Sequence, residues 1–176
     1  MNESTPAPEL DRRYSDADAR PPSWREVSAV LQERQMFWLS TTRADGRPHA
    51  VPLPAIWHER VLYFATGVTE QKAVNLARSP TCVLSTGTAD MNSGLDVAVE
   101  GDAERVADPT TLHRLADRWL AELDWPYDVV SGGFAHPGSD PEPGTEPVLV
   151  FAVRPTKILA FSKGTPFSQT RFRFPG

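Results

Sequence analysis

Short segments in which apolar and polar residues alternate make up most of this chain, and residues that favour turns separate them. The alternation predicts strands over residues 37–42, 49–57 and 61–66, and two more over 81–87 and 95–107. In the last of these the odd-numbered residues share one apolar face, as in a half-buried antiparallel strand. The first connections are of hairpin length, whereas parallel strands need long crossovers. An antiparallel sheet is therefore predicted.

The C-terminal part of the chain continues the strand pattern after a polar interruption. Residues 135–147 are rich in Pro, Gly and acidic residues, which predicts a long exposed loop. Two further strands are predicted over 148–153 and 158–162, on either side of 154–157. The tail at 169–174 alternates charged and aromatic residues, as a strand with one buried face does. Because chain ends fray unless something holds them, this tail is expected to dock onto the fold.

Three segments have helical spacing. A capping box at 23–26 begins a predicted helix over 24–34, and a second helix is predicted over 69–78. A third begins at 108–109, where an acidic cap precedes a proline. Many short strands with few helices predict a mainly β fold: an antiparallel barrel of six to seven strands flanked by a few short helices. The stripe of the third helix, expected in the core, comprises Leu112, Leu115, Ala116, Trp119, Leu120 and Leu123.

Composition limits the classes of function. The chain has 176 residues, 40% hydrophobic and 23% charged, which predicts one soluble domain over 23–176. The net charge of −5 argues against a nucleic-acid partner. Residues 1–22 are polar and resemble neither a signal peptide nor a membrane span, so a flexible leader, no membrane contact and a cytoplasmic location are expected. Cys82 is the single cysteine, which excludes an intrachain disulfide and argues for a small buried hydrophobe.

The junction between the third strand and the second helix combines groups that suit a phosphate. The strand ends at Thr66-Gly67, and Lys72 lies in the first turn of the helix, so free backbone N–H groups lie beside a cation. The plainer alternatives are that Thr66 only ends a strand and that Lys72 is a solvated helix residue. On the preceding strand, Pro52 and Pro54 remove two donors from one edge. That strand is therefore an edge strand, bulged, or turned toward a ligand on that side.

These features together resemble the pyridoxamine-phosphate-oxidase-like split β-barrel superfamily, and within it the flavin/deazaflavin-dependent oxidoreductase branch. Each matching segment is a common turn or strand pattern, and it is their order and spacing along most of the chain that carry the resemblance. The matching segments are 39–42 with 45–49, then 62–67, 72–80, 96–101 and 170–174.

The resemblance implies a homodimer that binds a flavin or deazaflavin in a groove between its subunits, with the phosphate at the turn after the third strand. His49 is a candidate neighbour of the ring, the alternative being a surface position. Arg171 or Arg173 is a candidate to reach the partner subunit's site and meet an anionic group, against a role in a plain edge strand or an interface. The residues that the resemblance assigns to the cofactor are Thr66 and Lys72 with Gln71 as neighbour, and the ring-facing backbone of Val51, Pro52, Leu53 and Pro54.

The sequence departs from the family pattern in two places. Many relatives carry a small hydroxyl and an Arg before the lysine, where this chain has Glu70 and Gln71. A carboxylate beside a phosphate is unfavourable, so Glu70 is expected to point to solvent or to pair with a cation such as Arg78. Oxidases of pyridoxamine phosphate use an Arg and a Lys on the strand at 50–56, and both are missing. Oxidation of pyridoxamine phosphate itself is therefore not expected, and the cofactor choice between FMN and the deazaflavin coenzyme F-420 tilts slightly toward the deazaflavin.

The predicted function is that of an oxidoreductase whose bound cofactor transfers a hydride to or from a small organic substrate. No side chain stands out as a catalytic acid, base or nucleophile, and no group of residues as a metal site. The alternative is a non-catalytic carrier or sensor of flavin or deazaflavin on the same barrel, or of haem with His49 as a candidate axial ligand. The fold cannot separate these alternatives, because function depends on the site.

Overall fold

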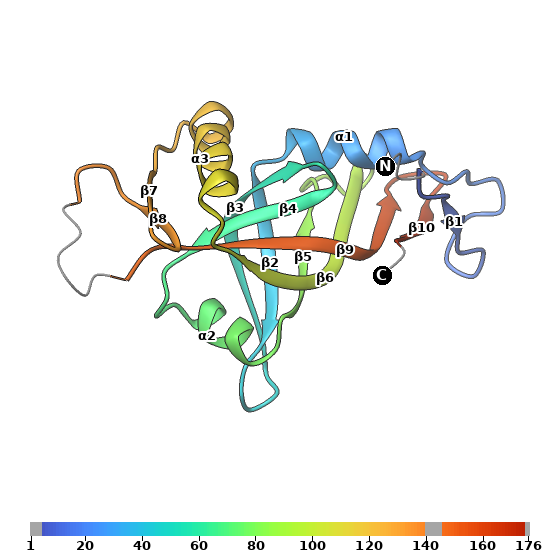
Figure 1. Ribbon diagram of the computed structural model, residues 1–176. Coiled ribbons are helices and arrows are strands. Elements are labelled where there is room, and N and C mark those ends of the chain that lie inside the picture. Colours follow the sequence, from blue (N-terminus) through green and yellow to red (C-terminus); the bar gives the residue numbers. More distant parts are fainter. Residues whose placement is uncertain (1–4, 140–145, 175–176) are drawn as a thin grey trace.

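Six antiparallel strands close into a barrel in the computed structural model, which describes residues 5–139 and 146–174 (Figure 1). The strand order is β9-β4-β3-β2-β5-β6, and β6 pairs again with β9 to close the barrel. The mainly β, antiparallel barrel predicted from the alternating pattern is confirmed. The strands are β2 (Met36–Thr42), β3 (Pro48–His58), β4 (Val61–Thr66), β5 (Thr81–Thr86), β6 (Leu95–Val106) and β9 (Leu149–Ser162).

Tight turns connect the first strands of the barrel. The β2–β3 hairpin turns at Gly46, whose φ of 83° suits a residue without a side chain. In the β3–β4 turn Glu59 and Arg60 both have positive φ, 50° and 61°, as the two central residues of a hairpin turn require. The predicted inward face of β6 is confirmed, since Val97 and Val99 are buried.

Strand β9 is one continuous element of 14 residues, where the sequence predicts two strands separated at 154–157. The chain passes this point without a turn because the pairing with β6 shifts register between Glu100 and Gly101. A β-bulge of this kind bends a strand without ending it. A side chain on Gly101 would place its Cβ 2.3 Å from the carbonyl oxygen of Arg154, so only glycine fits.

Two helices cover the barrel at different places, α1 (Trp24–Glu33) above it and α2 (Gln71–Arg78) below it in Figure 1. The capping box predicted for α1 is present, with Ser23 and Glu26 bonded to each other's backbone N–H. Helix α2 begins two residues after the predicted start at Thr69, because Glu70 has extended dihedrals and is the N-cap.

Helix α3 (Pro109–Leu123) packs outside the barrel and builds a second core. It covers a small hairpin, β7 (Asp128–Val130) and β8 (Gly133–Ala135), which the sequence pattern does not predict. The rings of Trp119 and Phe134 meet edge to face at 5.9 Å in this core. Most of the predicted stripe of α3 is buried, but Leu120 is 52% exposed. Of the loop predicted at 135–147, residues 140–145 lie outside the described residues.

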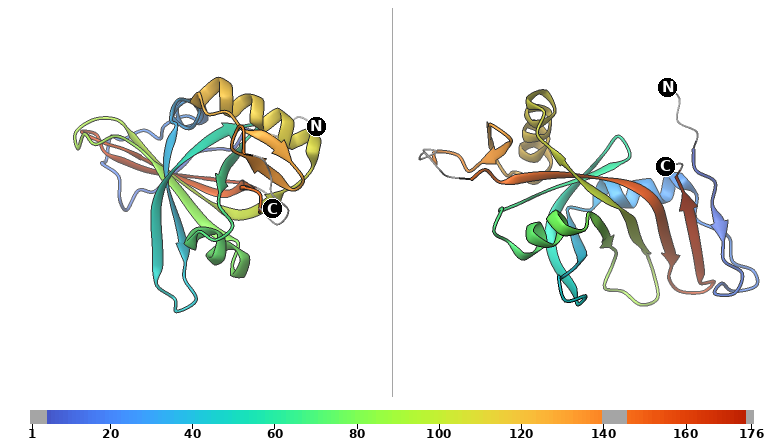
Figure 2. Two further views of the ribbon diagram at one scale, coloured as in Figure 1. Left: turned by 90° about the vertical axis from the view of Figure 1, so that its left-hand side faces the viewer. Right: turned by 60° about the horizontal axis from the view of Figure 1, so that its bottom comes forward.

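Both ends of the described chain extend the sheet beyond the barrel (Figure 2, right). Strand β10 (Ser168–Arg173) pairs with β9, so the tail docks as predicted. Strand β1 (Glu9–Leu10) pairs with β10, and the N–H of Asp11 donates to the carbonyl of Gln169 at 2.8 Å. The sequence predicts a flexible leader over 1–22, and within it residues 9–16 bond to β10 and to Phe167 before it, because the free edge of β10 offers backbone partners. Among the described residues, no helix has the length and apolar character needed to cross a membrane.

Candidate cofactor site

The end of β4 and the start of α2 bring three hydrogen-bond donors together. We call this the β4–α2 corner, formed by Thr66, Gly67, Glu70 and Lys72. The hydroxyl of Thr66 and the N–H of Gly67 donate to Glu70 Oε1, at 3.1 and 2.7 Å. The ammonium of Lys72 donates to the other oxygen, Glu70 Oε2. One carboxylate thus accepts from a hydroxyl, a backbone amide and an ammonium.

Glu70 pairs with a cation, as one of the two sequence-based expectations has it, but the cation is Lys72. Its side chain turns back over the corner and pairs with Lys72, not with Arg78. The reason is local, because the N-cap residue directly precedes the helix and its carboxylate lies next to the N–H of Gly67. The side chain of Lys72 is 11% exposed, while that of Glu70 is 49% exposed. The carboxylate therefore forms the solvent-facing side of the corner and the lysine its inner side.

The electrostatics of the corner favour a negative charge. Burial raises the pKa of Glu70, but the hydrogen bonds from Lys72 and Gly67 outweigh it and hold the pKa below its ordinary value. Burial, and then the charge of Glu70, raise the pKa of Tyr127 nearby. An anion at the position of the carboxylate is thus stabilised by the donors around it.

A pocket of about 320 Å³ opens beside the corner and is lined by three further elements. Its far side is an aromatic wall, formed by Trp125, Tyr127 and His136. Tyr127 lies 6.4 Å from Trp125 and 5.5 Å from His136 between ring centroids. The β7–β8 hairpin holds this wall, since Tyr127 also stacks on Phe134 at 4.8 Å. Stacked flat rings beside an anion site suit a ligand with a planar ring and a phosphate.

The two prolines of β3 face the same pocket. Pro52, Leu53 and Pro54 line it. Strand β3 pairs with β4 only over Ala55–His58, so within the described part of the chain the edge of β3 before Ala55 has no partner on that side. The N–H of Ala55 points to β2, where it donates to Gln35 O at 3.0 Å, so the nitrogens of Pro54 and Pro52 point to the open edge. Of the alternatives from the sequence, an edge strand and an edge turned toward a ligand both fit this geometry.

Other predicted site residues lie apart from this pocket. Gln71 is exposed and donates to Asn75 Oδ1 at 2.8 Å along its own helix. Val51 and His49 do not line the pocket, although they lie on the strand that does. His49 Nδ1 is buried and has no hydrogen-bond partner among the described residues.

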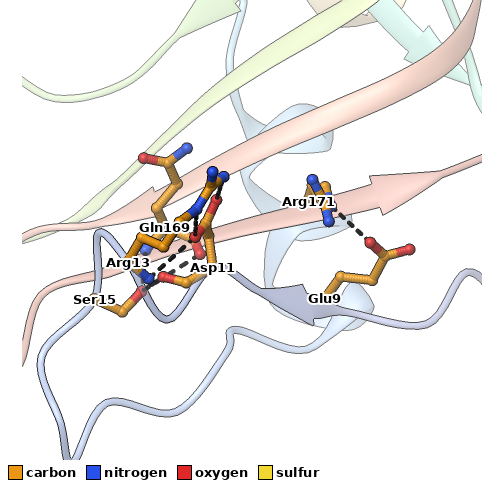
Figure 3. Close-up of polar contacts among 6 residues, drawn as sticks. All are labelled: Glu9, Asp11, Arg13, Ser15, Gln169 and Arg171. Atoms are coloured by element: carbon orange, nitrogen blue, oxygen red, sulfur yellow. Dashed lines mark hydrogen bonds and ion pairs between the residues drawn. The ribbon is translucent and has the colours of Figure 1, made fainter.

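Arg171 lies far from the corner, on the sheet extension (Figure 3). Its Nε donates to Glu9 Oε2 at 2.6 Å, and Arg173 Nε lies 3.7 Å from the other oxygen of Glu9. Nearby, Arg13 forms a close pair with Asp11 at 2.7 Å. Within one chain the N-terminal strand therefore supplies the anionic partner of Arg171, and the β4–α2 pocket does not contain this arginine.

The sequence-based reasoning missed the aromatic wall and one buried amide. Asn75 is 1% exposed, and its Nδ2 donates to Thr41 Oγ1 at 2.9 Å, which ties α2 to β2. A polar residue on the inner face of a predicted helix was the available signal. The aromatic residues at 125–136 gave a weaker signal, because a three-residue hairpin is too short for a clear alternation.

Comparison with known proteins agrees with the fold. Residues 23–160 match the family model of pyridoxamine 5'-phosphate oxidase. The chain belongs to this family. The matched range contains every barrel strand from β2 to β6, the helices and most of β9. A search of curated proteins gives no match.

Several solved structures share the fold of this family member. The conserved hypothetical protein Rv2991 from Mycobacterium tuberculosis has a TM-score of 0.63 and 19% identity, over 86% of this chain and 91% of that one. A FAD-binding protein from Mesorhizobium loti has a TM-score of 0.57 and 19% identity, over 88% and 98%. An F420 reductase has a TM-score of 0.51 and 25% identity, over 73% and 93%.

Proposed function

We propose that this protein is an oxidoreductase that binds FMN or the deazaflavin F420, with the cofactor phosphate at the β4–α2 corner. The observation that carries the proposal is the convergence of three donors on one carboxylate, since this donor set also suits a phosphate. Gly67 fits the same role, because a Cβ there would lie 3.3 Å from the bound carboxylate oxygen. The solved structures described as a FAD-binding protein and an F420 reductase support a flavin-type cofactor.

Different residues around the pocket bind different parts of the cofactor. Thr66, Gly67 and Lys72 hold the phosphate, while Tyr127 offers a flat surface to the ring and Pro54 also lines the pocket. When bound, such a cofactor supplies hydride transfer to or from a small organic substrate. The strand at 50–56 carries neither Arg nor Lys, which argues against pyridoxamine phosphate as substrate and favours the deazaflavin slightly. A homodimer and a cytoplasmic location belong to the same proposal.

A non-catalytic carrier of the same cofactor is the second candidate, favoured by the neighbour described only as a FAD-binding protein. A measurement of turnover distinguishes the oxidoreductase from the non-catalytic carrier. The protein with reduced cofactor is given a panel of enones and quinones, and their reduction is followed in the steady state. Tight binding without reduction of any of them would favour the carrier.

Removal of the Lys72 ammonium tests the proposed site. Wild-type protein is expected to bind FMN or F420 with a dissociation constant below about 1 mM, and Lys72→Ala to weaken binding about tenfold or more, because a charged hydrogen bond is lost. Arg78→Ala is the matched control, since it removes an exposed cation from the end of the same helix. Affinities follow from fluorescence titration. Equal affinity of the Lys72 and Arg78 variants, or no binding of either cofactor, contradicts the proposal.

A further inference from the structure

The carboxylate of Glu70 occupies the place that a ligand phosphate needs. It accepts from Thr66 Oγ1 and Gly67 N through one oxygen and from Lys72 Nζ through the other. These donors cannot all serve a second anion while they hold the first, because each N–H or O–H hydrogen points at one acceptor. A phosphate that enters the corner must therefore displace the carboxylate or bind beside it.

We propose that Glu70 is a specificity-determining residue, an internal competitor that disfavours ligands ending in a phosphomonoester. The inference rests on the proposed function, since it concerns which flavin-type ligand the same corner accepts. It selects for a phosphodiester, as in the deazaflavin cofactor, over the terminal phosphate of FMN.

Charge explains why Glu70 discriminates between a phosphomonoester and a phosphodiester. The corner contributes one positive charge from Lys72 and one negative charge from Glu70, so it is neutral as a whole. A phosphomonoester carries about −1.5 to −2 charges at pH 7, because its second pKa is about 6. A phosphodiester carries one. The repulsion by Glu70 is therefore nearly twice as large for the monoester and cancels the equally larger attraction by Lys72, so the second charge of the monoester gains no affinity while Glu70 stays in the corner.

The carboxylate is able to leave the corner. The Glu70 side chain is 49% exposed and lies at the N-cap, where no side-chain hydrogen bond caps the helix. It can therefore turn into solvent without breaking the helix. Lys72, at 11% exposure, stays in place to receive the incoming anion. Displacement thus costs the Glu70–Lys72 ion pair whichever phosphate enters the corner, and this cost opposes the binding of both ligands.

The experiment compares two ligands that differ only in the phosphate. Dissociation constants of FMN and riboflavin are measured for wild type and for Glu70→Gln. The variant keeps an acceptor for Gly67 and removes the charge. The FMN-to-riboflavin affinity ratio is expected to rise about tenfold in Glu70→Gln, since an unscreened like charge is worth this much or more near a protein surface. The affinity for the deazaflavin is expected to rise less than that for FMN.

The control variant is Glu33→Gln, which removes an exposed carboxylate from α1 on the other side of the barrel (Figure 1). Inorganic phosphate is a second probe: it is expected to raise the melting temperature of Glu70→Gln and not of wild type. The inference is overturned, even where flavins bind, if Glu70→Gln leaves both the FMN-to-riboflavin affinity ratio and the response of the melting temperature to phosphate as they are in wild type. A phosphate response confined to Glu70→Gln, with no flavin bound by any variant, supports the role of Glu70 and rejects the flavin function instead.

Discussion

At the scale of single residues, Cys82 shows how the barrel controls chemistry. The side chain lies on β5, is 3% exposed, and faces the core as predicted. Burial, and then the charge of Asp102, raise the pKa of Cys82 from 9.0 to about 12. A thiolate is the reactive form of cysteine, so this residue is a packing group and not a nucleophile.

The thiol of Cys82 is therefore expected to be unreactive toward thiol reagents in the folded protein. At pH 8, a thiol reagent such as dithionitrobenzoate should react with no cysteine in native protein and with one after unfolding in guanidinium. Because folding raises the pKa, the protonated thiol stabilises the fold fully below pH 9.0, and this contribution is lost as pH rises toward about 12. With a single cysteine in the chain, the signal has one source. Native reaction at the rate of free cysteine would contradict the buried position.

At the scale of elements, the buried side-chain amide of Asn75 holds helix α2, which carries Lys72. Asn75 lies on the inner face of α2 and donates to Thr41 on β2 at 2.9 Å. Buried polar groups of this kind must be paired, so the bond fixes both the distance and the rotation of α2 against the barrel. Lys72, one turn earlier on the same helix, is placed over the corner as a result.

Asn75→Ala is expected to destabilise the protein by about 1–3 kcal/mol, because a buried hydrogen bond and its packing are lost together. The affinity for the cofactor should also fall, since α2 is then free to shift. Val74→Ala, at an exposed position on the same helix, is the control and should change stability by less than about 0.5 kcal/mol. Urea denaturation measures the stabilities of both variants. Equal stabilities of the two variants would show that the Asn75 bond does not hold α2.

The elements themselves were largely predictable, and the reasons for the exceptions are physical. Alternation located the strands of the barrel, and caps located α1 and α3, because both signals are local. The continuity of β9 was not predictable, since it depends on a register shift against another strand, between Glu100 and Gly101 of β6. The β7–β8 hairpin depends on burial beneath α3, which three-residue strands do not reveal.

The candidate site was predicted in part for similar reasons. The position of Thr66 and Lys72 at one turn follows from chain order alone. The sequence left open whether Glu70 points to solvent or pairs with a cation. The turn of its side chain onto the same donors depends on the N-cap dihedrals. The pairing of β1 with β10 could not be foreseen either, because the partner of β1 lies some 160 positions later, at Thr170 and Arg171.

At the scale of the whole molecule, the outer face of the sheet presents one continuous row of residues. Cross-strand partners share a face of a sheet. The register therefore places six residues side by side across β3, β2, β5, β6, β9 and β10, a width of about 24 Å at ~4.8 Å per strand. Trp38 is 55% exposed in this row, and Met36 beside it is 53% exposed. The row consists of Pro52, Trp38, Ser85, Ala98, Leu159 and Arg171.

A face of this width can supply the roughly 800 Å² per partner of a stable interface, and the exposed indole is a suitable central anchor. We therefore expect the proposed homodimer to form through this face. Trp38→Asp should convert the dimer to monomer in sedimentation velocity, because it places a charge at the interface, while leaving the monomer folded. Leu120→Asp is the matched control, since Leu120 is similarly exposed but lies on α3. A wild-type protein that is monomeric at tens of micromolar, or a Trp38 variant that stays dimeric, would place the interface elsewhere.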